Sequence, residues 1–122
     1  MVESVVTVWF NPRCSKCVGA EELLAARGVP AHKVHYLDNP PSRTELEHVL
    51  ALLGTADPRA MMRTGESLYR ELGLAAATDA ELLDAMAEHP ILIERPIVIR
   101  GDRAVVARPP ELLLGLLEDA TA

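Results

Sequence analysis

Residues 4–37 contain two strand-like runs separated by a stretch of helix length, and this arrangement restricts the possible folds more than any other feature of the sequence. The run SVVTVWF at 4–10 is rich in β-branched and aromatic residues and precedes Asn-Pro, which is typical of a buried strand that ends there. A helix is predicted from about 15 to 27, with Gly28 as its C-terminal stop. The run AHKVHYL at 31–37 predicts a second strand, which the helical crossover makes parallel to the first.

The C-terminal part of the chain has a different pattern. The segment IVIRGDRAVVA at 97–107 contains two β-type runs joined by Gly-Asp, which indicates a tight antiparallel hairpin. A final helix is expected in RPPELLLGLLE at 108–118, because proline is tolerated in the first turn of a helix. This half therefore has the order strand, strand, helix.

The middle of the chain is predicted to be helical. The stretches SRTE at 42–45 and TDAE at 78–81 fit the capping-box pattern, so helices are expected at about 43–53 and 79–88, with short helices between them. The complete order is β-α-β, helices, β-β-α. It predicts an α/β protein with a thioredoxin-like fold, in which a four-stranded mixed sheet is interrupted by a helical insertion at about 42–90. We expect one domain over 1–122.

Composition limits the location and the partners of the protein. The sequence does not open with a basic segment and a long apolar run, because Glu3 interrupts it, so a cytoplasmic location is expected. No apolar run approaches the roughly 20 residues of a membrane helix, and no membrane partner is expected. The net charge of −6 and the aromatic content of 3% disfavour nucleic acid as a partner.

Both cysteines lie in the short stretch NPRCSKC. Cys14 directly precedes the predicted first helix, whose free N–H groups and positive dipole end stabilise a thiolate. Arg13 and Lys16 add positive charge, and such surroundings lower a cysteine pKa from about 8.5 to roughly 3.5–7.5. We therefore predict that Cys14 is a nucleophile and that Arg13 helps to tune its pKa.

Cys17 has two interpretations. It lies one helical turn after Cys14 and can act as a resolving thiol that closes a disulfide, or it can be an inert residue on the helix. A zinc site is not favoured, because the four histidines show no paired metal-ligand spacing with the cysteines or with each other (His32, His35, His48 and His89). No metal is expected.

Five stretches together resemble the ArsC family of glutaredoxin-coupled arsenate reductases and their relatives: WFNPRCSKC, YLDNPPSRTELEHVL, RAMMRTGESLYRELGL, HPILIERPIVI and ARPPELLLGLL. They follow the family order over about 5–117. The resemblance implies a thioredoxin-like (glutaredoxin-like) fold with a helical insert. In such folds the proline at the position of Pro96 is typically cis and lies against the cysteine loop.

The resemblance also implies the residues of an oxyanion site. Cys14 falls on the cysteine that attacks arsenate, and the arginines that hold the oxyanion fall on Arg63, Arg95 and Arg108; Arg59 is a weaker candidate. This set makes chemical sense, because a thiolate can approach an anion only when cations neutralise the repulsion. Guanidinium groups suit this task, since their planar forks match the oxygens of an oxyanion.

The resemblance implies that arsenate or a similar oxyanion is the substrate and that glutathione is the electron donor. It also implies glutaredoxin or thioredoxin as the redox partner, and no bound cofactor. The sequence departs from the well-characterised reductases at two positions: Phe10 replaces a histidine, and Cys17 is an additional cysteine. Two alternatives are an Spx-like regulator that uses a Cys14–Cys17 disulfide and an ArsC-related thiol oxidoreductase with another substrate. All three arginine positions are filled, which favours the enzyme.

Overall fold

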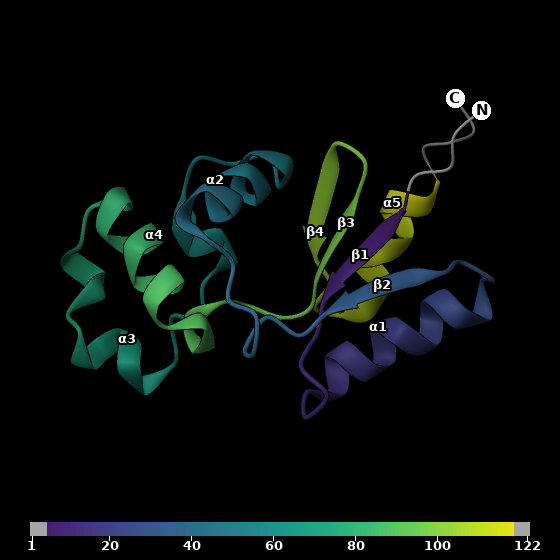
Figure 1. The fold of residues 1–122 in the computed structure, drawn as a ribbon, viewed down its shortest axis with the longest axis horizontal. Helices are drawn as coiled ribbons and strands as arrows, with labels where there is room; N and C mark the ends of the chain where they lie inside the picture. Colours follow the sequence, from purple (N-terminus) through teal and green to yellow (C-terminus); the bar gives the residue numbers. More distant parts are fainter. Residues whose placement is uncertain (1–4, 119–122) are drawn as a thin grey trace.

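The structure is a computed structural model that describes residues 5–118 (Figure 1). Four strands form one sheet in the order β2-β1-β3-β4: β1 (Val6–Trp9), β2 (Ala31–Val34), β3 (Ile97–Arg100) and β4 (Arg103–Val106). β1 is parallel to β2 and antiparallel to β3, and β3 is antiparallel to β4. The predicted thioredoxin-like α/β fold with a mixed sheet is therefore confirmed.

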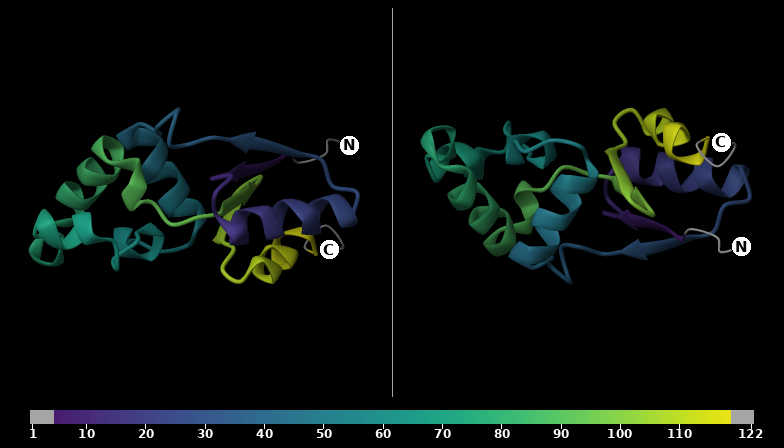
Figure 2. Two further views of the ribbon diagram at one scale, coloured as in Figure 1. Left: turned by 90° about the horizontal axis from the view of Figure 1, so that it is seen from below. Right: turned by 90° about the horizontal axis from the view of Figure 1, so that it is seen from above.

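The helices divide into two groups. In Figure 2 one face of the sheet is covered by α1 (Ser15–Ala26) and α5 (Leu114–Leu117), while the insert forms a separate lobe beside the sheet. The lobe contains α2 (Arg43–Leu52), α3 (Ser67–Glu71) and α4 (Asp79–Glu88), together with 3-10 turns at Pro58–Met61, Leu74–Ala76 and Pro90–Leu92. Within residues 5–118, none of the helices combines the length and apolar character needed to cross a bilayer.

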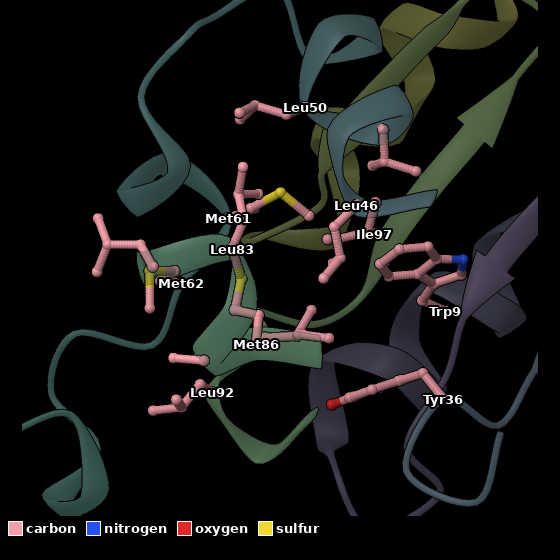
Figure 3. Packing of buried hydrophobic residues seen from close by; sticks show 14 of the residues in the cluster. Trp9, Tyr36, Leu46, Leu50, Met61, Met62, Leu83, Met86, Leu92 and Ile97 are labelled. Carbon is pink, nitrogen blue, oxygen red and sulfur yellow. The ribbon is translucent and has the colours of Figure 1, made fainter. Parts of the chain in front are cut away.

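Alternating side chains of the sheet create two apolar clusters. Val8 and Val98 belong to the cluster on the α1 side, which also contains both cysteines. Trp9 and Ile97, their neighbours along the strands, belong to the second cluster, which Figure 3 shows packed with side chains of the insert such as Leu46, Met61 and Met86. The cysteines therefore lie on the opposite face of the sheet from the insert, close to the end of β1.

Hydrogen bonds explain where the long helices begin. Ser42 Oγ accepts the Glu45 N–H at 3.1 Å, and Glu45 Oε1 accepts the Ser42 N–H at 2.8 Å. Thr78 and Glu81 repeat this arrangement at the start of α4, with distances of 3.2 and 2.8 Å. Both predicted capping boxes are confirmed.

Some element boundaries differ from the sequence prediction. The second strand was expected to reach Leu37 but ends at Val34. The reason is a turn, because the His35 carbonyl accepts the N–H groups of Asp38 and Asn39 at 3.0 and 2.9 Å. The first strand is shorter than 4–10, and residue 4 lies outside the described residues. The final helix, expected as one element, is a 3-10 turn at Pro110–Leu113 followed by α5.

Two prolines that follow arginines shape the region near the cysteines. The Arg95–Pro96 peptide bond is cis, as the resemblance predicts, and the Arg108–Pro109 bond is also cis. The Pro96 carbonyl accepts the Ala107 N–H at 2.9 Å, which joins the two segments. Arg95 and Arg108 are therefore held near each other although they are far apart in the sequence.

Candidate active site

The loop between β1 and α1 places Cys14 at the start of the helix. Asn11 fixes this loop twice, since its carbonyl accepts the Cys14 N–H at 3.0 Å and its Oδ1 accepts the Arg13 N–H at 3.0 Å. The Cys14 carbonyl then accepts the Val18 N–H, which begins the helix. Cys14 is the N-cap residue of α1 and is 8% exposed. Its sulfur therefore lies where helical N–H groups have no backbone partner.

Opposing effects act on the Cys14 thiol. Burial acts to raise its pKa. The backbone N–H and the thiol of Cys17, and the backbone N–H of Lys16, act in the opposite direction because they stabilise the thiolate. The positive charge of Arg95 adds to this effect, and the net result is a pKa of Cys14 below its ordinary value. Arg13 is exposed and is not among these groups, so its role in tuning stays a prediction.

Cys17 has the opposite character. Its side chain is fully buried, and this burial is the main reason why the pKa of Cys17 is raised to about 12. The neighbouring Cys14 sulfur raises it further, while the Asn11 N–H, 3.5 Å from Cys17 Sγ, partly opposes the shift. Both cysteines are free thiols. At neutral pH Cys17 is therefore a protonated donor that stabilises the Cys14 thiolate, and its resolving role stays a prediction.

Cys17→Ala is expected to raise the pKa of Cys14, because it removes a thiol that favours the thiolate. Cys17→Ser should keep that pKa below the ordinary value of about 8.5, since a hydroxyl can also donate a hydrogen bond. The rate of Cys14 alkylation measured against pH gives both values. A Cys14 that titrates near 8.5 in Cys17→Ser would contradict the proposed activation of this thiol.

Arg108 and Arg95 lie next to the reactive sulfur. Arg108 Nη1 donates to Cys14 Sγ at 3.8 Å and to the Arg95 carbonyl at 3.1 Å. Arg95 Nη1 pairs with Glu94 Oε1 at 3.3 Å. Among the buried side-chain nitrogens and oxygens of residues 5–118, only Arg95 Nε has no hydrogen-bond partner. The site therefore contains a guanidinium group, that of Arg108, in contact with the Cys14 sulfur, and a buried N–H donor, Arg95 Nε, that lacks an acceptor.

Arg63 and the cysteine loop line the same cavity, and no hydrogen bond joins Arg63 to Cys14. It lines a cavity of about 430 Å³ whose other walls are the loop residues 10–13, the turn at 35–38 and Ile91. Arg63 Nη2 pairs with Glu66 Oε2 at 3.2 Å, and Arg63 Nη1 donates to the Ile91 carbonyl at 3.4 Å. The structure thus brings Arg108 to the sulfur, holds Arg95 beside Arg108 where its charge acts on Cys14, and places Arg63 at the adjoining cavity.

Arg59, the weaker candidate, is engaged elsewhere. Its Nε donates to the Tyr69 hydroxyl at 2.8 Å, and its Nη2 donates to the carbonyls of Leu74 and Ala75 at 2.8 and 3.1 Å. These bonds connect the segments on either side of α3. Arg59 therefore braces the insert and is not part of the group around Cys14.

Tyr69→Phe is expected to lower the midpoint of thermal unfolding, because it removes the acceptor of the Arg59 Nε bond. It should leave the pKa of Cys14 unchanged, since none of these contacts involves the cysteine loop. Differential scanning fluorimetry and alkylation measured against pH test the two expectations. A changed Cys14 pKa in Tyr69→Phe would show that this interaction reaches the site.

Phe10 replaces the family histidine with an apolar side chain. It is 5% exposed, its ring meets the His35 ring edge-on at 5.7 Å, and Lys33 Nζ lies 5.0 Å from the ring centre. Phe10 therefore offers no hydrogen bond to the thiolate. Stabilisation of Cys14 comes from the helix start, Cys17 and the arginines instead.

The sequence interpretation missed Tyr36, which was assigned to the second strand. Its side chain is 1% exposed, and it lines the same cavity as Arg63. A polar aromatic residue near the end of the predicted second strand is the one sequence signal that could have identified it. In the part of the chain that the structure describes, no three His, Cys, Asp or Glu side chains gather as metal ligands would.

The thioredoxin-like sheet carries a cysteine of lowered pKa at a helix start with arginines beside it, and these are the groups that thiol chemistry on an anion requires. The model of the ArsC family matches residues 9–115, and the chain belongs to this family.

The similar proteins cover nearly the whole chain. An arsenate reductase of Neisseria meningitidis serogroup A is 45% identical over 114 residues, which cover 92% of this chain and 97% of that protein. An arsenate reductase of Haemophilus influenzae is 43% identical, with 92% of this chain and 98% of that protein covered. The solved structure of an arsenate reductase from Vibrio cholerae has a TM-score of 0.90 and 42% identity, and covers 93% of this chain and 98% of that one.

Proposed function

We propose that the protein is an arsenate reductase that uses Cys14 as its nucleophile and Arg63, Arg95 and Arg108 to hold the oxyanion. The observation that carries this proposal is the buried Arg95 Nε, a donor without an acceptor beside a thiol whose pKa is lowered. A tetrahedral oxyanion supplies such an acceptor. The relatives named arsenate reductase support arsenate as that anion.

The reaction begins when the Cys14 thiolate attacks arsenic(V). A sulfur–arsenic bond forms, and one arsenate oxygen leaves as water after protonation. A glutathione thiol then displaces a second oxygen as water, so that arsenic carries both sulfurs. Both sulfur–arsenic bonds then break: one electron pair forms the disulfide between Cys14 and glutathione, the other stays on arsenic, and arsenic(III) takes up one water and leaves as arsenite. Arg108 and Arg95 favour these steps by offsetting negative charge near the sulfur.

The mixed disulfide must be reduced before the next turnover. We assign this step to glutaredoxin with a second glutathione, which is oxidised to glutathione disulfide. The net reaction converts two glutathiones and one arsenate to glutathione disulfide, arsenite and water. The cytoplasm is the compartment where glutathione keeps thiols reduced, and it suits this cycle.

Arsenate-dependent oxidation of NADPH by the purified protein tests the proposal. The assay is run with glutathione, glutathione reductase and glutaredoxin, and separately with thioredoxin and its reductase. Activity with glutathione and glutaredoxin is the expected result, and activity with thioredoxin alone would reassign the reductant. Absence of activity with either system, together with ready closure of a Cys14–Cys17 disulfide, would favour the Spx-like regulator instead.

A further inference from the structure

The Tyr36 side chain is 1% exposed, and its hydroxyl makes no hydrogen bond to any residue of 5–118. The oxygen is not enclosed by protein, since Arg95 Nε is the only fully buried side-chain nitrogen or oxygen of residues 5–118 without a partner. The ring is therefore packed in the protein, while the hydroxyl stays open to water or to a ligand. Figure 3 shows Tyr36 at the lower edge of the cluster that contains Trp9, with its oxygen at the free end of the ring. A ligand atom can therefore accept a hydrogen bond from the Tyr36 hydroxyl.

The groups that act on the phenol locate its hydroxyl. Burial is the main reason why the pKa of Tyr36 is raised to about 12. The charges that add to or oppose this shift are those of Cys17, Arg95, Arg63 and Cys14. These are the two cysteines and two of the arginines of the candidate site. The hydroxyl therefore lies within electrostatic reach of both cysteines, Arg63 and Arg95, and it is protonated at neutral pH.

The cavity beside the cysteine loop gives a ligand access to this hydroxyl. Tyr36 and Arg63 line that cavity together with Asn11 and Arg13. Tyr36 also lines a second cavity of about 510 Å³ below α2, whose walls include Trp9 and Val49. None of the three arginines of the candidate site lines that second cavity, whereas Arg63 lines the first, so the first one is where an anion would meet the phenol.

On the basis of the arsenate reductase function proposed above, we infer that the Tyr36 hydroxyl donates a hydrogen bond to an oxygen of the bound oxyanion. Tyr36 would thereby complete the anion site on the side of Arg63, with which it lines the cavity. A phenol is suited to this position, because it donates one hydrogen bond without adding a charge that a nearby thiolate would have to balance. The ring keeps its place in the apolar cluster while the oxygen faces the anion.

Tyr36→Phe removes this donor and keeps the ring, and Tyr69→Phe is the matched control, because the Tyr69 hydroxyl is bonded to Arg59 instead. Inorganic sulfate is the probe: it should occupy the site and slow alkylation of Cys14, and the concentration needed for half-protection is measured. Tyr36→Phe should need about tenfold more sulfate, the effect of one hydrogen bond to a charged group. Its unfolding midpoint should stay unchanged.

The outcomes separate this inference from the proposed function. If sulfate protects the wild type and Tyr36→Phe equally, the role of Tyr36 is wrong while the arginine site stands. A fall in the unfolding midpoint of Tyr36→Phe that matches Tyr69→Phe would show a structural hydroxyl and overturn the inference. If sulfate does not protect the wild type, the oxyanion site itself is absent and both fail. Protection without arsenate turnover would remove the proposed function, and the sulfate comparison would still decide the role of Tyr36.

Discussion

Cys14→Ser is expected to abolish arsenate reduction, a larger effect than that of any other substitution proposed for the site. A serine hydroxyl at this position would stay protonated, and it cannot form the disulfide through which arsenic receives its electrons. The fold should be retained, because Cys14 is the N-cap residue of α1 without a side-chain capping bond to lose, and serine is a good N-cap residue. Arsenite formation and circular dichroism of the same preparation measure both expectations.

Cys17→Ser is the matched control for Cys14→Ser. With glutathione and glutaredoxin it should turn over normally, because glutathione resolves the intermediate and the hydroxyl preserves a donor to the thiolate. The buried Cys17 thiol, with its pKa raised to about 12, is poorly suited to attack as a thiolate. Should Cys17→Ser complete one turnover and then stop, Cys17 would be the resolving thiol. Mild oxidation followed by peptide mapping would then localise a Cys14–Cys17 disulfide in the wild type.

Arg108→Ala should lower arsenate turnover by an amount on the order of 10². Arg108 donates to both Cys14 Sγ and the Arg95 carbonyl. Its loss therefore makes the Cys14 thiolate less stable and removes a hydrogen bond that positions Arg95. Arg108→Lys should recover part of the activity, since it keeps the charge but loses the planar fork. Steady-state rates and sulfate protection of Cys14 are measured for each variant.

The control for these variants is Arg27→Ala, an exposed arginine at the opposite end of α1, which should behave as the wild type. Alanine at Arg63 or Arg95 should weaken turnover and sulfate protection as well. Wild-type turnover and protection in all three alanine variants of the site would remove the oxyanion interpretation, whatever the assay shows for Cys14.

The fold could be predicted from the sequence because local signals agreed with one another. β-type runs, capping boxes and the Gly-Asp turn each specify an element, and their order leaves few topologies. The end of β2 could not be predicted in this way. The His35 carbonyl accepts two N–H groups in a turn, although residues 35–37 continue the strand-like pattern.

The site could be predicted only in part. Cys14 follows from the helix start, and the three arginine positions follow from the family resemblance. The groups that surround the arginines follow neither from the helix start nor from the family resemblance. The carboxylates of Glu66 and Glu94 pair with Arg63 and Arg95, so an incoming anion must compete with them. Tyr36 could not be predicted, because the position of its hydroxyl depends on how the turn after β2 packs against the cysteine loop.

Arsenate-dependent attachment of glutathione to Cys14 tests the central claim most directly. The reduced protein is incubated with arsenate and glutathione in the absence of glutaredoxin, and free thiols are then blocked and the peptides mapped. We expect glutathione on Cys14, and only when arsenate is present, because the mixed disulfide forms as arsenite leaves and waits for glutaredoxin. A Cys14 that stays a free thiol with arsenate and glutathione both present would contradict the assignment of this residue as the nucleophile.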